Sequence, residues 1–175
     1  PIENKQGKIV GFGGRSLDGQ EPKYLNSPET PLFDKGRNLY GIFQALDSAR
    51  KKQQLILVEG DTDVIALHQA GIDTGVAPLG TALTVEQIQL AWRITREPYL
   101  CFDGDTAGQR AAARAAERAL PHLKPGYSLR FVILPEGEDP DSLVKKNGPA
   151  AMQEYLGLAT SLSDSPIEIF FGSSS

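Results

Sequence analysis

Three short acidic motifs contain the residues of this chain best suited to chemistry. They are Glu59-Gly60-Asp61-Thr62-Asp63, Asp103-Gly104-Asp105 and Glu138-Asp139-Pro140-Asp141. Each motif follows an apolar run typical of a buried strand, at residues 55–58, 99–102 and 129–134. If those strands are parallel neighbours in one sheet, the three motifs meet at the same edge. Carboxylates gathered that closely repel one another unless a divalent cation neutralises them, so the sequence predicts an acidic metal site.

Each motif also has a purely structural interpretation. Asp61 and Asp63 open a predicted helix, where acidic side chains favour the positive end of the helix dipole. Asp139 followed by Pro140 is a favourable helix start. The Asp103 motif fits an N-cap with a tight turn. Acidic pairs recur, however, at three predicted strand ends, and three unrelated caps explain that recurrence poorly. The recurrence therefore favours a shared metal site.

The elements that must position these motifs follow from the apolar patterning. Predicted strands at 55–60, 75–79, 98–103 and 128–134 alternate with predicted helices at 61–70, 84–94, 106–120 and 140–147. Repeated strand–helix units predict an α/β fold with a parallel sheet flanked by helices. The residues after Gly148 are helical by composition.

The N-terminal part differs in pattern and in charge. Residues 8–15 are predicted to form a hairpin strand, residues 22–37 an ordered loop and residues 39–52 a helix. Residues 1–52 hold nine Lys and Arg against six Asp and Glu, whereas the remainder holds nine against sixteen, for a formal net charge of -4. A basic flank beside an acidic pocket suits a polyanionic substrate held through metal ions.

Within that flank, a set of basic side chains with one aromatic residue among them predicts a phosphate-contacting patch. Scattered surface charges are the alternative. The set is Arg15, Lys23, Tyr24, Lys35 and Arg37.

The composition narrows the class of protein. The 175 residues, 40% of them apolar, suffice for one compact domain with an appendage. Cys101 is the single cysteine, which excludes an intrachain disulfide and indicates a reducing compartment. No apolar run of about 18 residues and no signal-peptide pattern occurs, so we expect a cytoplasmic protein without a membrane partner. The start at Pro1 and the Gly-Ser-Ser-Ser end indicate an excised fragment.

The motifs resemble those of a known family. VEGDTDV (58–64), CFDGDTAG (101–108) and LPEGEDPDSLV (134–144), in that order, resemble the Toprim domain of bacterial DnaG-type primases. GFGGR (11–15) and PKYLNSPET (22–30), followed by FDKGR and LYG, are similar to the second part of the basic subdomain of those primases. The resemblance implies a Toprim-like parallel sheet at 53–148, part of a small basic α+β subdomain at 1–52, and the start of a helical subdomain plus a tail at 149–175.

The resemblance also implies an activity, the synthesis of RNA primers from ribonucleoside triphosphates on single-stranded DNA. The implied cofactor is Mg²⁺ or Mn²⁺, as two ions, which would act by bridging the triphosphate and stabilising the leaving pyrophosphate. Zinc and the replicative helicase would bind domains that this chain does not contain.

Residue roles carry over by position in the motifs. Glu59 is the implied catalytic acid of the first motif. The implied metal ligands are Asp103, Asp105, Asp139 and Asp141, with Asp63 in support. The implied nucleotide and template path comprises Arg15, Lys23, Tyr24, Asn26 and Lys35. Asp61 is the departure, because family members usually carry an aromatic residue there, and an extra acid either strengthens metal binding or repels phosphates.

Two other functions are compatible with parts of the sequence. Phe102-Asp103-Gly104-Asp105-Thr106 resembles the nucleophile motif of haloacid-dehalogenase-like phosphatases, but there the motif ends the first strand of the sheet and here it ends the third. A non-catalytic Toprim module that binds only DNA or a protein partner is the second alternative. Binding alone does not require so many carboxylates, which disfavours that alternative.

Overall fold

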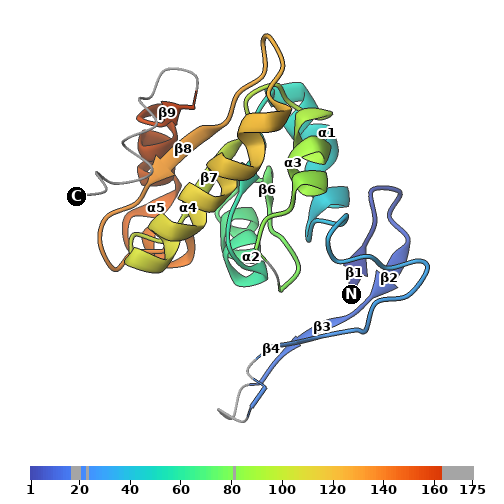
Figure 1. Cartoon of the computed structure of the whole chain (residues 1–175). Helices are drawn as coiled ribbons and strands as arrows, with labels where there is room; N and C mark the ends of the chain where they lie inside the picture. Colours follow the sequence, from blue (N-terminus) through green and yellow to red (C-terminus); the bar gives the residue numbers. More distant parts are fainter. Residues whose placement is uncertain (17–20, 23, 81, 163–175) are drawn as a thin grey trace.

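The computed structural model describes residues 1–16, 21–22, 24–80 and 82–162 (Figure 1). Its N-terminal flank contains β1 (Ile2–Glu3), β2 (Ile9–Gly11), β3 (Gly13–Arg15), β4 (Tyr24–Asn26) and α1 (Ile42–Lys52). The sheet domain contains the strands β5 (Ile56–Leu57), β6 (Gly75–Val76), β7 (Tyr99–Phe102), β8 (Arg130–Ile133) and β9 (Thr160–Ser161). Its helices are α2 (Asp61–Gln69), α3 (Val85–Trp92), α4 (Thr106–Ala119), the short 3₁₀ turn η1 (Leu120–His122) and α5 (Pro140–Gly157).

The five-stranded sheet has the order β6-β5-β7-β8-β9. The first four strands are parallel, which confirms the predicted parallel sheet. The edge strand β9 is antiparallel to β8, and the sequence did not predict it. Its residues, Thr160 and Ser161, are polar and form no apolar run, so their side chains do not indicate a strand.

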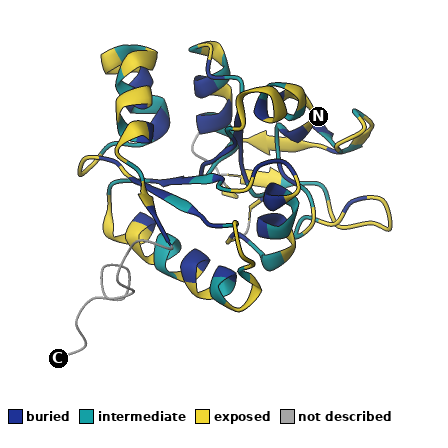
Figure 2. Cartoon of the chain, turned by 90° about the horizontal axis from the view of Figure 1, so that it is seen from above, coloured by how far each residue is buried: buried dark blue, intermediate teal, exposed yellow. Residues whose placement is uncertain are grey.

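Successive side chains of each strand point to opposite faces of the sheet, and each face has its own hydrophobic core. Leu57, Leu100 and Phe131 pack with residues of α1, α3 and α4. Ile56 and Cys101 point the other way and pack with residues of α2 and α5. Figure 2 shows the buried residues concentrated on the central strands and on the sheet-facing sides of the helices. Burial on both faces explains why these strands read as continuous apolar runs rather than alternating ones.

The last helix, α5, joins two stretches that the sequence predicted separately. The expected helix over 140–147 and the helical residues expected after Gly148 form one element to Gly157, with a kink where Gly148 adopts φ 78° and ψ 173° and Pro149 follows. Gly-Pro normally ends a helix. Here Met152 and Leu156, beyond the kink, bury their side chains in the same core as Val58. That burial explains why the chain returns to helical geometry after the break.

The N-terminal flank consists of two separate antiparallel ribbons. The predicted strand over 8–15 is interrupted at Phe12, because β2 pairs with β1 and β3 pairs with β4. The predicted loop over 22–37 contains β4, which its content of Pro, Asn and Ser concealed. In Figure 1 the β3–β4 ribbon projects away from the sheet domain. Leu17-Asp18-Gly19-Gln20, a sequence typical of a turn after the predicted strand, lies outside the described residues.

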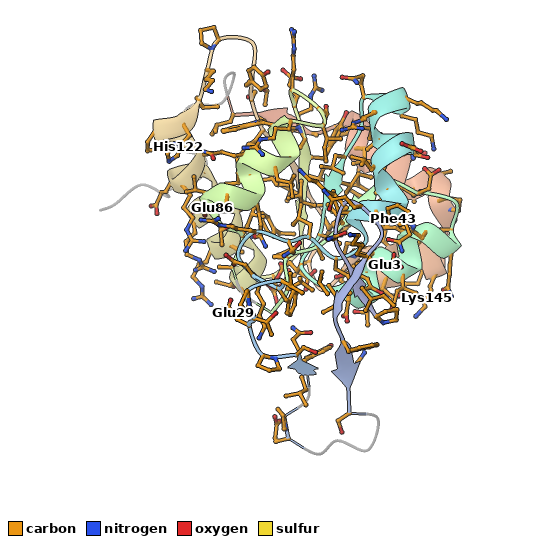
Figure 3. The ribbon with its side chains drawn as sticks, turned by 90° about the vertical axis from the view of Figure 1, so that its right-hand side faces the viewer. Glu3, Glu29, Phe43, Glu86, His122 and Lys145 are labelled. Atoms are coloured by element: carbon orange, nitrogen blue, oxygen red, sulfur yellow. The ribbon has the colours of Figure 1, made fainter. Side chains whose placement is uncertain are left out.

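The flank is fastened to the sheet domain at several points. Tyr40 and Ala77 exchange backbone hydrogen bonds of 2.7 and 3.2 Å. Ile2, Phe33 and Leu79 form a small apolar cluster of their own. Within the flank, Glu3, labelled in Figure 3, accepts a hydrogen bond from the side chain of Gln44 and so links β1 to α1. None of the described helices is both long and apolar enough to cross a membrane.

A close backbone approach joins the loops that follow β7 and β8. The Gly104 N–H donates to the carbonyl of Glu138 at 2.9 Å. A Cβ at position 104 would lie 1.8 Å from the Pro135 carbonyl oxygen, so no side chain fits there. Only glycine allows the second and third acidic motifs to lie this close together.

We therefore expect Gly104→Ala to destabilise the fold by about 2–4 kcal/mol, because the backbone of one loop must move. Urea unfolding monitored by circular dichroism measures the change. Gly157→Ala is the matched control, since a Cβ there meets no atom within 4 Å. Equal stability of the two variants would contradict this account of Gly104.

Candidate metal and nucleotide site

An open hollow of about 1130 Å³ lies at the carboxyl edge of the sheet, facing the β3–β4 ribbon. Residues of all three acidic motifs line its floor, and residues of the N-terminal flank line the opposite wall. The acidic lining residues are Glu59, Asp61, Asp63, Asp103, Asp139 and Asp141. The flank contributes Gly14, Arg15, Tyr24, Leu25, Asn26 and Lys35. The structure thus brings together most of the residues that the sequence singled out.

The first two motifs are linked directly by a hydrogen bond. The backbone N–H of Asp103 donates to Oε1 of Glu59 at 3.0 Å. The two strands that carry these residues pair in parallel, with Leu57 opposite Leu100. This register brings both acids to the end of the sheet where the hollow opens.

Asp103 is the acid in the hollow whose charge is most disfavoured by its surroundings. Its Oδ1 atom is buried and has no hydrogen-bond partner among the described residues. Burial, followed by the negative charges of Glu59, Asp63 and other nearby acids, raises its pKa from 3.8 to about 7. A buried carboxylate oxygen without a donor is costly, and a bound cation would relieve that cost.

Asp63, in the first turn of α2, is a second buried acid with a raised pKa. Its side chain is 7% exposed. Burial, then the charge of Asp139, raises its pKa from 3.8 to about 6, although backbone hydrogen bonds from Gly60 and Asp141 act in the opposite direction. The Gly60 N–H donates to Oδ2 of Asp63 at 3.2 Å, which fixes the start of α2. Asp63 therefore both orders the first motif and adds charge to the hollow.

The third motif combines a helix cap with acidic side chains in the hollow. Asp139 accepts a 2.6 Å hydrogen bond from the Ser142 N–H and caps α5. Asp141 pairs with Lys145 at 2.7 Å, and Lys145 also lines the hollow. The structural and the functional interpretations of this motif are therefore compatible.

Asp61 lines the hollow, whereas Asp105 does not. Asp105 is exposed, is absent from the residues that line the hollow, and caps α4 by accepting a 2.7 Å hydrogen bond from Gly108. Its role as a metal ligand stays a prediction, although its charge contributes to the raised pKa of Asp103. Asp61 does line the hollow, and its Oδ1 accepts from the Thr62 N–H at 2.9 Å.

The carboxylates are near one another but do not form a closed cage. Among the described residues, no group of three His, Cys, Asp or Glu side chains is already arranged to hold a metal ion. Helix caps and the bond from Gly60 direct individual carboxylates toward the protein. The unpartnered oxygen of Asp103 and the raised pKa values nevertheless fit a divalent cation, because it removes the repulsion that raises them. Asp103, Asp139 and Asp141 line the floor and offer carboxylate oxygens of the kind that such a cation binds.

The basic wall is built on the β3–β4 ribbon and the segment after it. Arg15 pairs across the ribbon with Tyr24, and its guanidinium carbon lies 5.4 Å from the centre of the Tyr24 ring. Asn26 is opposite Gly13 in the same ribbon. Lys35 comes from the segment between β4 and α1. Lys23, which the sequence also predicts here, lies outside the described residues.

Comparison with known proteins identifies the family. A family model described as "Toprim domain" matches residues 53–132, and one described as "DNA primase catalytic core, N-terminal domain" matches residues 1–46. The DNA primases of Pasteurella multocida and Escherichia coli K12 are 51% and 50% identical over 164 and 163 residues. The chain belongs to the DnaG-type DNA primase family.

Solved primase structures agree with this assignment. The structure of a DnaG primase catalytic domain bound to ssDNA superposes with a TM-score of 0.87 at 49% identity, over 94% of this chain and 52% of that one. A DNA primase domain from Pseudomonas aeruginosa superposes with a TM-score of 0.90 at 48% identity, over 98% and 52%. The Toprim-like α/β fold is thereby confirmed. The chain spans 28% of the length of the two curated primases that it matches.

The sequence missed several residues of the primase hollow. Ile65, Ala66 and Gln69 of α2 line it, as do Pro78, Leu79 and Gly80 after β6. These residues carry no charge and sit at ordinary positions of their elements, so no local pattern distinguishes them. Lys145 was not predicted as a site residue either, although its spacing of four residues from Asp141 is a usable signal.

We expect Asp103→Asn to stabilise the metal-free protein by about 1 kcal/mol at pH 8. The pKa of Asp103 is higher in the folded state than its usual 3.8, so the folded state binds more protons between pH 4 and pH 7. Asp103 therefore lowers the free energy of unfolding progressively as pH rises through that window. The asparagine side chain carries no ionisable group, so the variant does not lose this stability.

Calorimetry with a chelator at pH 4 and pH 8 measures this effect. The gain in Tm should be larger at pH 8 than at pH 4. Glu154→Gln, which alters an exposed acid outside the hollow, should shift Tm little at either pH. A gain of the same size at both pH values would show that charge repulsion is not its cause.

Proposed function

We propose that this chain contains the metal-binding and nucleotidyl-transfer centre of an enzyme that synthesises RNA primers on single-stranded DNA. One observation carries the proposal: a wall of carboxylates and a wall of basic and polar side chains face each other across one hollow. A nucleoside triphosphate requires both, because its phosphates are anionic and its reaction is favoured by divalent cations. The ssDNA bound to the related DnaG catalytic domain supports the proposed template.

In the proposed reaction, the 3′-hydroxyl of the primer forms a bond to the α-phosphorus of the incoming nucleotide. The bond between the α-phosphorus and the bridging oxygen to the β-phosphate breaks, and pyrophosphate leaves. Glu59, held by the N–H of Asp103, is the proposed acceptor of the hydroxyl proton. Mg²⁺ or Mn²⁺ bound by Asp103, Asp139 and Asp141, with Asp63 and Asp105 in support, would neutralise the charge on the phosphates.

The basic wall has a separate task in this proposal. Arg15 and Lys35 contact phosphates without reading sequence, and Tyr24 offers a ring on which a base can stack. Asn26 donates or accepts hydrogen bonds at the same wall. Contacts with a replicative helicase and a zinc site are proposed for parts of the primase outside this chain.

The proposed domain division follows the two family matches. Residues 1–52 form part of the basic subdomain and residues 53–148 the Toprim domain, with 149–175 as the start of a helical subdomain and a tail. The matches to 1–46 and 53–132 support the first boundary. The proposed second boundary coincides with the kink at Gly148, and residues on both sides of the kink share one core.

We expect Asp103→Ala and Asp139→Ala to weaken Mn²⁺ binding by this chain at least tenfold, because each removes a carboxylate from the floor. Titration of free Mn²⁺ by electron paramagnetic resonance measures the affinity. Glu154→Ala, which removes an exposed acid outside the hollow, should bind Mn²⁺ like the unchanged protein. Affinity that is the same in all four proteins would rule out a metal site on this floor.

The same substitutions separate the proposed enzyme from a non-catalytic Toprim module. In the full-length primase, Asp103→Ala should reduce primer synthesis by a factor of at least about 10² while leaving the affinity for single-stranded DNA within a factor of a few. Primer synthesis measured with labelled nucleotides, together with DNA binding by fluorescence anisotropy, tests this. Unchanged synthesis would favour the binding-module alternative.

A further inference from the structure

We propose that Thr84 and Gln87, at the start of α3, are positioning residues that hold Lys35 over the acidic floor. The inference rests on the proposed nucleotide site but concerns residues to which neither the motifs nor the family matches assign a role. Lys35 belongs to the basic flank, whereas α3 belongs to the sheet domain. The contact between them therefore fixes the segment that carries Lys35 to the sheet domain, which supplies the acidic floor.

The contact consists of three hydrogen bonds from two side chains to three backbone carbonyls. The side-chain amide of Gln87 donates to the carbonyls of Lys35 at 2.9 Å and Asn38 at 2.8 Å. The hydroxyl of Thr84 donates to the Gly36 carbonyl at 2.6 Å. Gln87 is fully buried at 0% exposure. Breaking such bonds leaves buried polar atoms unsatisfied.

The two side chains are themselves fixed by the capping box of α3. The Gln87 N–H donates to Oγ1 of Thr84 at 3.1 Å, and the Thr84 N–H donates to Oε1 of Gln87 at 3.0 Å. With Oε1 used in this way, the amide nitrogen of Gln87 is the atom that faces the two carbonyls. The start of α3 thus presents a rigid pair of donors to the segment 35–38.

The segment is held from its own side as well. Asp34 accepts from the Gly36 N–H at 2.9 Å, and Asn38 donates its side-chain amide to the Asp34 carbonyl at 2.7 Å. Phe33, immediately before, is fully buried. In Figure 3, Glu29 marks the chain that leads into this segment and Glu86 marks the first turn of α3. The backbone of Lys35 therefore has little freedom to move.

The side chain of Lys35 lines the hollow while its carbonyl is bound to α3. Its ammonium makes no ion pair with any residue in the described parts of the chain, so it is available to an anionic ligand. Lysine is a long, flexible cation, and its use at a site depends on where its backbone is fixed. The α3 contact supplies that fixed point, and a misplaced charge weakens phosphate binding.

The test compares Thr84→Val, which removes the hydroxyl, with Thr84→Ser, which retains it. Isothermal titration of a ribonucleoside triphosphate in the presence of Mn²⁺ measures nucleotide affinity. We expect Thr84→Val to weaken it about tenfold, Thr84→Ser to leave it close to that of the unchanged protein, and Mn²⁺ affinity to be the same in both variants. Gln87→Leu, which removes the other two bonds, should behave like Thr84→Val.

A double substitution distinguishes positioning from a general loss of structure. If Thr84 acts through Lys35, then Thr84→Val should weaken nucleotide binding no further in a protein that already carries Lys35→Ala. Thr95→Val is the matched control. The Thr95 hydroxyl also donates to a backbone carbonyl, that of Gln53 at 3.3 Å, but Thr95 does not line the hollow. It should lower Tm without changing nucleotide affinity.

Two results would overturn the inference. One is nucleotide affinity in Thr84→Val within twofold of the unchanged protein. The other is losses from Thr84→Val and Lys35→Ala that multiply in the double variant, since this would place the two residues in independent roles. Failure of the unchanged protein to bind nucleotide at all would instead contradict the proposed function, and the positioning role with it.

Discussion

Repulsion among carboxylates at one edge of the sheet is the constraint on which the rest of this structure depends. Parallel strands β5 and β7 deliver Glu59 and Asp103 to the same end, and the Gly104 contact draws the third motif toward them. The result is a carboxylate oxygen on Asp103 without a partner in the described parts of the chain, and raised pKa values for Asp63 and Asp103. A fold that keeps such a cluster gives up stability unless a cation occupies it.

The basic flank places positive charge on the wall opposite the carboxylates. It does not neutralise the floor by ion pairing: of the described acids on the floor, Asp141 alone has an ion pair, with Lys145. Arg15 rests on Tyr24, and Lys35 is fixed by α3, so the positive charges remain on their own wall. The separation leaves room between the walls for a ligand that carries negative charge and brings or binds cations. A nucleoside triphosphate has that character.

The sequence predicted those features that depend on long, repeated patterns. Apolar runs such as 99–102 identified the central strands, and the acidic motifs that follow them identified the floor of the hollow. It could not predict features decided by tertiary contacts. The edge strand β9 consists of the polar residues Thr160 and Ser161. The helical stretches on the two sides of Gly148 join into α5 because Met152 packs into the core beyond the kink. Asp105 matches its motif, yet its position on α4 places it outside the lining. The role of Gln87 depends on its contacts with Lys35 and Asn38, which are distant in sequence, so no local pattern indicates it.

The most direct test of the account is anomalous diffraction from crystals of this chain soaked in millimolar Mn²⁺. The account predicts a manganese peak in the hollow, bound by Asp103 together with Asp139 or Asp141. A peak confined to other surface carboxylates, or an empty floor at that concentration, would contradict the claim that the three acidic motifs form a metal site.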